Sequence, residues 1–187
     1  MNKRVTDFAK KSIVMGILIF VIRLLFSPPE SFYDFIGITG EVVSITMALM
    51  GIYCSLLWKF NPLEKTPKIM GSYEGVIEYN FNGEFEKKDA TVIIKQNLLS
   101  TKVQIVTNEI ISNTITSDLI VENNQHVLYY TYITNPKSKY SKENPMQYGT
   151  CRLLINAKNK LTGTYWTSRQ TIGDLELSKT GKKRWKQ

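Results

Sequence analysis

The sequence predicts a membrane α-hairpin followed by an all-β domain, a compact eight-stranded antiparallel up-and-down β-barrel. The first sixty of the 187 residues contain two long apolar runs, a pattern typical of membrane-spanning helices. From position 72 onward apolar and polar residues alternate, and turn-forming residues recur at short spacing. We therefore expect three parts: a two-helix transmembrane region with a short linker at 1–69, a β-barrel at 70–180, and a basic tail at 181–187.

The two apolar runs are predicted to span the membrane. The first, 12–26, is interrupted only by Arg23; the second, 36–58, contains one charge, Glu41, and ends in a tryptophan next to a lysine. About 20 predominantly apolar residues cross a bilayer, and Trp and Lys favour its surface. A cleaved signal peptide is the alternative for the first run, but no small-residue cleavage site follows it.

Charges around these runs predict the orientation of the hairpin. Basic residues precede the first run and follow the second, whereas the connector SPPESFYDF is acidic. Because basic flanks remain in the cytoplasm, we expect a multi-pass protein of the cell inner membrane with its N-terminus and barrel cytoplasmic. Arg23 and Glu41 lie near the same end of the hairpin, where they could pair, reach the interface, or serve a pore or an assembly.

Small residues recur every three or four positions along the second run, which lets helix backbones approach closely. Two interpretations stay open. The stripe packs against the first span of the same hairpin, or it packs between copies of the protein, in which case Gly40, Ser44 and Ala48 form the contact.

Eight strands are predicted after the hairpin, connected by tight turns such as Asn82-Gly83. Eight short antiparallel strands in about 110 residues suit an up-and-down barrel, although a two-sheet sandwich is the alternative. The expected strands are 72–80, 90–96, 101–107, 114–121, 125–133, 147–155, 161–167 and 171–178.

Charged residues predict which face of several strands points inward, because successive side chains alternate. Outward glutamates in the first strand place Tyr73 and Tyr79 inside, and an outward Lys95 places Val92 inside. In the seventh strand we choose Tyr165, and with it Thr167 and Arg169, as inward. In the sixth strand the face of Tyr148, Thr150 and Leu154 includes Arg152, which is expensive to bury without an anionic partner.

Odd-numbered strands run away from the membrane, so their ends meet at the remote end of the barrel. Tyrosines, threonines and arginines gather there. Tyrosine faces stack on flat rings and arginine pairs with phosphate, so this end suits an aromatic ring that carries phosphate. The alternative is a solvated surface of cross-strand tyrosine pairs and ordinary exposed charges. The expected ligand-binding residues are Tyr79, Thr107, Arg152, Tyr165, Thr167 and Arg169.

The sequence carries no motif for catalysis, metal binding or a cofactor. The only histidine, His126, has no predictable partner, and Cys54 and Cys151 form neither a metal cluster nor a disulfide framework. Outside the tail the β-domain is nearly neutral, which argues against a DNA or RNA polymer as partner. We expect a binding protein and not an enzyme, with no cofactor and no metal.

The order of parts resembles the two-transmembrane, β-strand-rich effectors of CBASS, the bacterial cyclic-oligonucleotide anti-phage systems. The motifs that carry the resemblance are GSYEG at 71–75, LTGTYWTSR at 161–169 and GDLEL at 173–177. The resemblance implies an inner-membrane effector of abortive infection whose cytoplasmic eight-stranded barrel senses a cyclic nucleotide. It further implies that the protein, once it has bound the cyclic nucleotide, forms a homo-oligomer and disrupts the membrane, which kills the infected cell.

Two other classes of protein remain open. The first is a membrane-tethered, lipocalin-like carrier or sensor of an apolar small molecule; Arg152 and Arg169 weigh against it. The second is a structural subunit of a membrane complex with a filled barrel.

The tail is predicted to lie on anionic lipid at the cytoplasmic face, because basic residues and tryptophan favour that surface. The alternative is a solubilising terminus. Its membrane-surface residues are Lys182, Lys183, Arg184, Trp185 and Lys186.

Overall fold

The computed structural model describes residues 3–81, 83–156 and 159–180. It divides into two compact units. The first runs to Thr66 and includes Asn97–Leu99; the second contains Pro67–Gln96 and continues from Ser100. The predicted tail residues Lys182, Lys183, Arg184, Trp185 and Lys186 lie outside the described residues.

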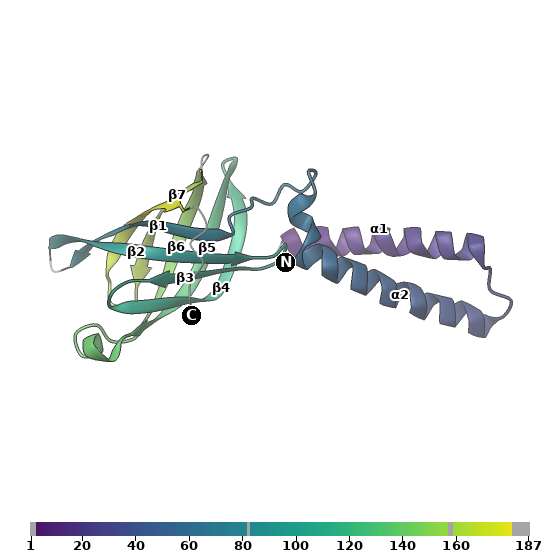
Figure 1. The fold of residues 1–187 in the computed structure, drawn as a ribbon, viewed down its shortest axis with the longest axis horizontal. Coiled ribbons are helices and arrows are strands. Elements are labelled where there is room, and N and C mark those ends of the chain that lie inside the picture. The colour runs from purple at the N-terminus through teal and green to yellow at the C-terminus, as the bar shows by residue number, and fades with distance from the viewer. Residues whose placement is uncertain (1–2, 82, 157–158, 181–187) are drawn as a thin grey trace. The chain divides into compact units, whose positions relative to one another are not determined.

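The first unit begins with a hairpin of two helices, α1 (Lys3–Phe26) and α2 (Phe32–Ser55), followed by the 3-10 helix η1 (Leu57–Phe60) (Figure 1). The hydroxyl of Ser31 caps α2 by accepting the N–H of Asp34 at 3.2 Å. This cap starts the second helix at Phe32 rather than at 36, and the helix ends at Ser55 rather than at 58.

Within the described residues, α2 is the one helix long and apolar enough to cross a membrane. Helix α1 has the same length, but its first third is charged. Its apolar part, 12–26, rises only about 22 Å, against about 30 Å for the hydrocarbon core. A membrane association is therefore supported by α2, and a second span remains a prediction.

The two helices pack along one face of α2, where Ile38, Val42, Thr46 and Met50 are buried. The backbone of Gly16 in α1 approaches Thr46, since a Cβ atom at Gly16 would lie 3.5 Å from the threonine Oγ1. At about 100° per residue this seam lies opposite the small-residue stripe. Gly40, Ser44 and Ala48 are exposed, so hairpin packing does not use the stripe.

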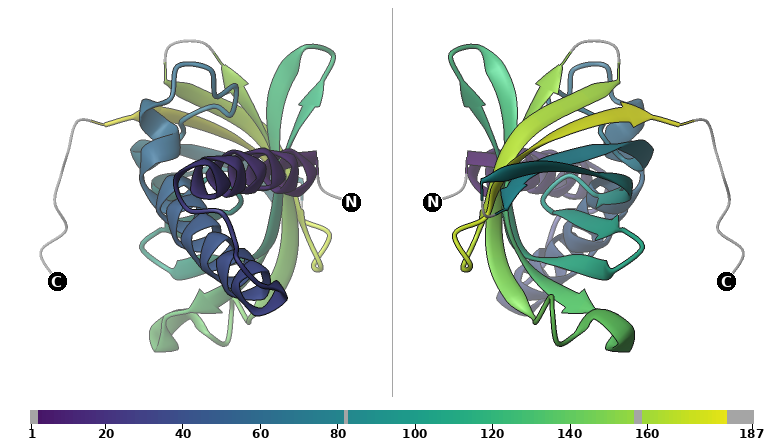
Figure 2. Two further views of the ribbon diagram at one scale, coloured as in Figure 1. Left: turned by 90° about the vertical axis from the view of Figure 1, so that its right-hand side faces the viewer. Right: turned by 90° about the vertical axis from the view of Figure 1, so that its left-hand side faces the viewer.

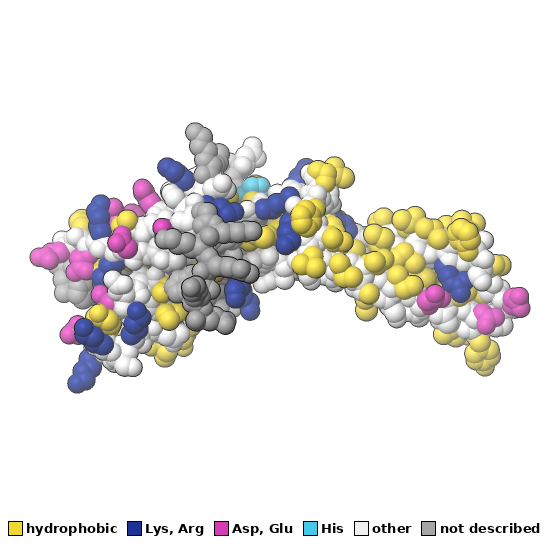
Figure 3. Space-filling model, viewed as in Figure 1, with side chains coloured by type: hydrophobic (Ala, Val, Ile, Leu, Met, Phe, Trp, Pro, Cys, Tyr) yellow, Lys and Arg dark blue, Asp and Glu magenta, His cyan; other side chains and the backbone are white. Residues whose placement is uncertain are grey.

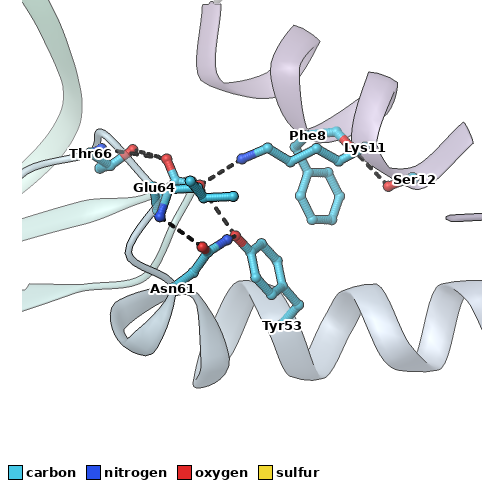
Figure 4. A network of polar contacts seen from close by, with 8 residues as sticks. Phe8, Lys11, Ser12, Tyr53, Asn61, Glu64 and Thr66 are labelled. Atoms are coloured by element: carbon cyan, nitrogen blue, oxygen red, sulfur yellow. Dashed lines mark hydrogen bonds and ion pairs between the residues drawn. The ribbon is translucent and has the colours of Figure 1, made fainter. Parts of the chain in front are cut away.

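Each end of the hairpin carries an ion pair. At one end Arg23 Nε lies 3.1 Å from Glu41 Oε2, the pairing that the sequence allowed. At the other end Lys11 Nζ lies 2.6 Å from Glu64 Oε2, and Thr66 donates to the same carboxylate at 2.9 Å (Figure 4). Burial alone would raise the pKa of Glu64, but the hydrogen bonds from Lys11 and Thr66 lower it overall. These bonds fasten the linker after α2 to α1.

The second unit is a closed antiparallel barrel in which each strand pairs with the next and the last pairs with the first (Figures 1 and 2). This confirms the predicted barrel, and the two-sheet sandwich is excluded. The strands are β1 (Gly71–Phe81), β2 (Glu84–Gln96), β3 (Thr101–Val106), β4 (Ile110–Glu122), β5 (Gln125–Pro136), β6 (Gln147–Asn156), β7 (Lys160–Thr167) and β8 (Ile172–Lys179).

Strand β2 begins at Glu84, six residues before the predicted start at 90. The added residues are mostly charged, and they continue the ladder with β1, for example Lys87 opposite Glu78. A strand arm exposed on its outer side shows no apolar alternation, which is why the sequence pattern missed it.

The core lies inside the barrel. The predicted inward residues Tyr73 and Val92 are buried, and so are Leu128 of β5 and Leu153 of β6, whose inward faces the sequence left undecided. Glycine is required where strands approach most closely: a Cβ atom at Gly75 would lie 1.9 Å from the carbonyl oxygen of Glu176.

Candidate ligand-binding site

One end of the barrel interior is open and forms a cavity of about 320 Å³. Three turns at this end, β3–β4, β5–β6 and β7–β8, contribute lining residues, and the β1–β2 hairpin contributes residues of its two strands. The volume lies at the lower end of the range of about 300 to 1,000 Å³ for small-molecule sites. The lining residues on which the argument depends are Tyr79, Lys88, Glu109, Ser112, Tyr130, Tyr132, Gln147, Tyr165 and Arg169.

Tyrosines dominate the walls of the cavity. The rings of Tyr130 and Tyr132 lie 5.8 Å apart at an angle of 45°, and Tyr165 faces the same space from β7. Burial raises the pKa of all three hydroxyls well above the ordinary value, and it raises the pKa of the neighbouring Cys151 thiol to about 12. The wall is therefore neutral at pH 7, and its rings can stack on a flat ligand.

Three polar atoms in the cavity wall are buried without a hydrogen-bond partner among the described residues. They are Ser112 Oγ, the Tyr130 hydroxyl oxygen and Gln147 Oε1. A buried polar group without a partner costs about 1–3 kcal/mol. Groups of this kind mark places where a polar ligand or ordered water completes the hydrogen bonding.

The rim of the cavity carries two cations. Lys88 Nζ lies 2.9 Å from Glu109 Oε1 and 5.1 Å from the centre of the Tyr79 ring. Burial alone would lower the pKa of Lys88, but its bonds to Tyr79 and Glu109 raise it overall. Within the described part of the chain, Arg169 Nη1 donates to the backbone oxygen of Glu143, at 3.2 Å, and to no other group. An anionic ligand can therefore use Arg169 directly but must compete with Glu109 for Lys88.

The structure brings five of the six expected ligand-binding residues together. Tyr79, Thr107, Tyr165, Thr167 and Arg169 all line the cavity. Thr107 also has a local task, because its Oγ1 accepts the backbone N–H groups at positions 109 and 110, at 3.2 and 3.1 Å. It thereby holds the β3–β4 turn that forms part of the rim.

Arg152 does not join them, and the expectation that it lies at the ligand site is corrected. Its neighbours Cys151 and Leu153 are fully buried inside the barrel, so Arg152 points outward. There its Nη2 lies 2.7 Å from Glu122 Oε2, and its Nε donates to the Tyr129 hydroxyl at 2.9 Å. The anionic partner that an arginine requires is thus a glutamate of β4.

Sequence analysis missed Lys88, Ser112 and Gln147. Lys88 preceded the predicted start of its strand, but extending the alternation outward from Lys95 places every even-numbered residue of β2 inside, Lys88 included. No comparable signal identified Ser112, because β4 contains a bulge between Thr114 and Thr116 that shifts its pairing with β5.

A closed barrel with a tyrosine-lined, partly cationic cavity at one end defines a small-molecule receptor domain. Residues 64–179 match the family described as Cap15, cyclic dinucleotide receptor domain. The chain is also 37% identical over 182 residues to CD-NTase-associated protein 15 of Staphylococcus schleiferi, which covers 96% of this chain and 99% of that relative. The protein belongs to the Cap15 family, and the resemblance to CBASS effectors is confirmed.

Proposed function

We propose that the protein is an anti-phage CBASS effector whose barrel binds a cyclic oligonucleotide, most simply a cyclic dinucleotide, in the cavity. The observation that carries the proposal is the cavity itself. Ser112, Tyr130 and Gln147, each with a buried oxygen that has no partner among the described residues, line one cavity with the cations Lys88 and Arg169. The function is recognition and not catalysis, and it requires no cofactor.

The ligand chemistry follows from this lining. Purine rings stack on the faces of Tyr132 and Tyr165, and their polar edges supply hydrogen bonds to the unpaired oxygens of the wall. One phosphate pairs with Arg169 at the rim. A second phosphate draws Lys88 away from Glu109, which releases that carboxylate and loosens the β3–β4 turn. Tyr79 and Thr167 complete the rim.

We further propose that the occupied protein forms a homo-oligomer and disrupts the inner membrane, which kills the infected cell. The exposed stripe on α2 supports an assembly role, because the hairpin seam uses the opposite face. Replacing Gly40, Ser44 or Ala48 by Leu should then reduce nucleotide-dependent crosslinking and cell killing. Unchanged crosslinking and killing would remove the stripe from the assembly.

The proposed location is the inner membrane, with both spans inserted and the barrel in the cytoplasm, where cyclic oligonucleotides are made. The basic tail, including Trp185, would lie on the anionic surface beside the second span. Deleting 181–187 should weaken the co-sedimentation of the detergent-solubilised protein with anionic liposomes. The difference between the two forms should shrink as salt is added. Equal sedimentation of the two forms would contradict this role for the tail.

The test of the ligand uses the full chain in detergent micelles. Thermal unfolding is followed with cyclic di-AMP, cyclic di-GMP, cyclic GMP–AMP and oleic acid. A nucleotide at a hundred times its dissociation constant should add about 2.7 kcal/mol to the free energy of unfolding. Stabilisation by oleic acid alone would instead support the lipocalin-like carrier, and no stabilisation by any cyclic dinucleotide would contradict the proposal.

A further inference from the structure

The outer surface of the barrel carries two patches that the cavity does not use. The first, the acidic wall, is the outer face of the β1–β2 hairpin. On this face Lys87 is already paired with Glu78, and the exposed Lys95 lies near the opposite end of β2. At the tip of the hairpin the side chain of Phe85 is 81% exposed. The acidic wall is defined by Glu74, Glu78, Phe85 and Asp89, all of them exposed.

The second patch, the basic wall, is the outer face of the β5–β6 region. Lys139 and Lys142 are exposed in the loop that contains the 3-10 helix η2 (Ser138–Tyr140), and Met146 and Tyr148 are 57% and 56% exposed beside them. The basic wall is defined by these four residues. Figure 3 shows acidic side chains gathered over the β1–β2 tip and basic side chains over the β5–β6 loop below it.

The two walls lie on opposite sides of the barrel, and each has its large apolar residue near the cavity end. In a closed barrel of eight strands in sequence order, β2 and β6 are separated by four strands in either direction. Phe85 and Tyr148 are each the second residue of their strand, and both strands start at the cavity end. Each wall therefore presents a large apolar side chain at the level of the cavity, framed by charges of opposite sign.

We propose that the barrels of neighbouring copies dock head to tail, with the acidic wall of one copy on the basic wall of the next. This inference rests on the proposed function, which requires assembly. A contact between two different patches is heterologous, so it repeats and builds a ring or a filament. It also keeps all copies parallel, as copies anchored in one membrane must be. Opposite charge favours this pairing, whereas acidic wall against acidic wall repels.

The walls are also placed to respond to the cavity. Phe85 is followed by Glu86, which lines the cavity and accepts a hydrogen bond from Tyr79, and Tyr148 is preceded by the cavity residue Gln147. Because alternate residues of one strand face the cavity and the wall, a ligand that shifts the inner residue shifts the outer one. Occupancy of the cavity thereby adjusts both docking surfaces.

The test measures self-association of the full chain in detergent micelles by sedimentation velocity, without nucleotide and with cyclic di-AMP, cyclic di-GMP or cyclic GMP–AMP. Phe85→Ala and Tyr148→Ala should each raise the protein concentration needed for half-assembly about 30-fold or more, as expected for an exposed aromatic anchor. Ile120→Ala, on the exposed outer face of β4, is the matched control and should change nothing.

Two mixing experiments identify the contact as heterologous. Each alanine variant keeps one intact wall, so a mixture of Phe85→Ala and Tyr148→Ala should form one-to-one dimers and stop there. Asp89→Lys and Lys142→Glu should each weaken assembly, and the double variant Asp89→Lys/Lys142→Glu should recover it.

The results separate this inference from the proposed function. If the alanine variants still bind nucleotide in calorimetry but no longer assemble, docking through the two walls is supported. Wild-type assembly in both alanine variants, or a mixture that stays monomeric, would overturn it. Failure of the wild-type chain to bind any of the three nucleotides contradicts the proposed function, and the nucleotide-free series then still decides whether the walls dock.

Discussion

The two halves of the barrel interior follow the same strand alternation but differ in their hydrogen bonding. In the closed half most inward residues are apolar and buried, and the one tyrosine there, Tyr73, donates to the Ile69 carbonyl at 2.8 Å. One inward residue of this half, Thr101, has a buried hydroxyl oxygen without a partner among the described residues. In the open half Tyr130 and Ser112 are equally buried but have no partner among the described residues. The difference teaches that one half is built to hold the fold and the other to hold a ligand.

The largest expected effect is in the closed half. Leu128→Ala removes a fully buried side chain from the core cluster and should lower the free energy of unfolding by about 2–5 kcal/mol. Chemical denaturation of the full chain in detergent measures this. Ile120→Ala, at 36% exposure on β4, is the control and should stay within about 0.5 kcal/mol. A small effect of Leu128→Ala would mean that the closed half is not the core.

The next effect belongs to the open half. Arg169→Ala should weaken binding of a cyclic dinucleotide by about 1.5–3 kcal/mol, because a charged hydrogen bond to phosphate is lost. The free energy of unfolding should change little, since Arg169 is exposed and its side chain bonds to a single carbonyl oxygen among the described residues. Calorimetry measures binding. Undiminished affinity in Arg169→Ala would exclude this arginine from the site.

Removing one hydroxyl from each half gives the sharpest comparison. Tyr73→Phe deletes a satisfied donor and should destabilise the fold by about 1 kcal/mol, whereas Tyr130→Phe deletes an unpaired group and should leave stability equal or higher. Tyr130→Phe should instead weaken nucleotide binding by about 0.5–1.5 kcal/mol. If the two substitutions destabilise the apo protein equally, the distinction between the halves fails.

The smallest effect is expected outside the barrel. Arg152→Ala should not alter nucleotide affinity, and its cost in stability should be that of an exposed ion pair. The pKa of Glu122 is lowered by its hydrogen bonds from Arg152 and Tyr129. A carboxyl group whose pKa is lower in the folded than in the unfolded state stabilises the fold at pH values above its unfolded pKa. The loss of stability in Arg152→Ala should therefore be present near pH 7 and vanish as the pH falls through the folded-state pKa of Glu122. Denaturation at a series of pH values measures it. A difference that persists in acid would assign the effect to lost packing of the arginine stem.

Local pattern alone predicted much of this protein. Alternation with a few outward charges identified eight strands and the inward faces of β1, β2 and β7, since a side chain's face depends only on its own strand. Tyr79, Tyr165 and Arg169 followed from those faces. Two apolar runs predicted the hairpin helices, and the spacing of Arg23 and Glu41 allowed their pairing, because helix geometry is equally local.

Only the tertiary structure decided which distant residues meet. The mixed face of β6 did not reveal that the partner of Arg152 is Glu122, thirty positions away on another strand. Nor did the sequence show that hairpin packing uses Val42 and Thr46 rather than the small residues opposite. Strand face and helix period are properties of a short segment, but partner choice depends on barrel closure and helix packing, which the whole chain determines together.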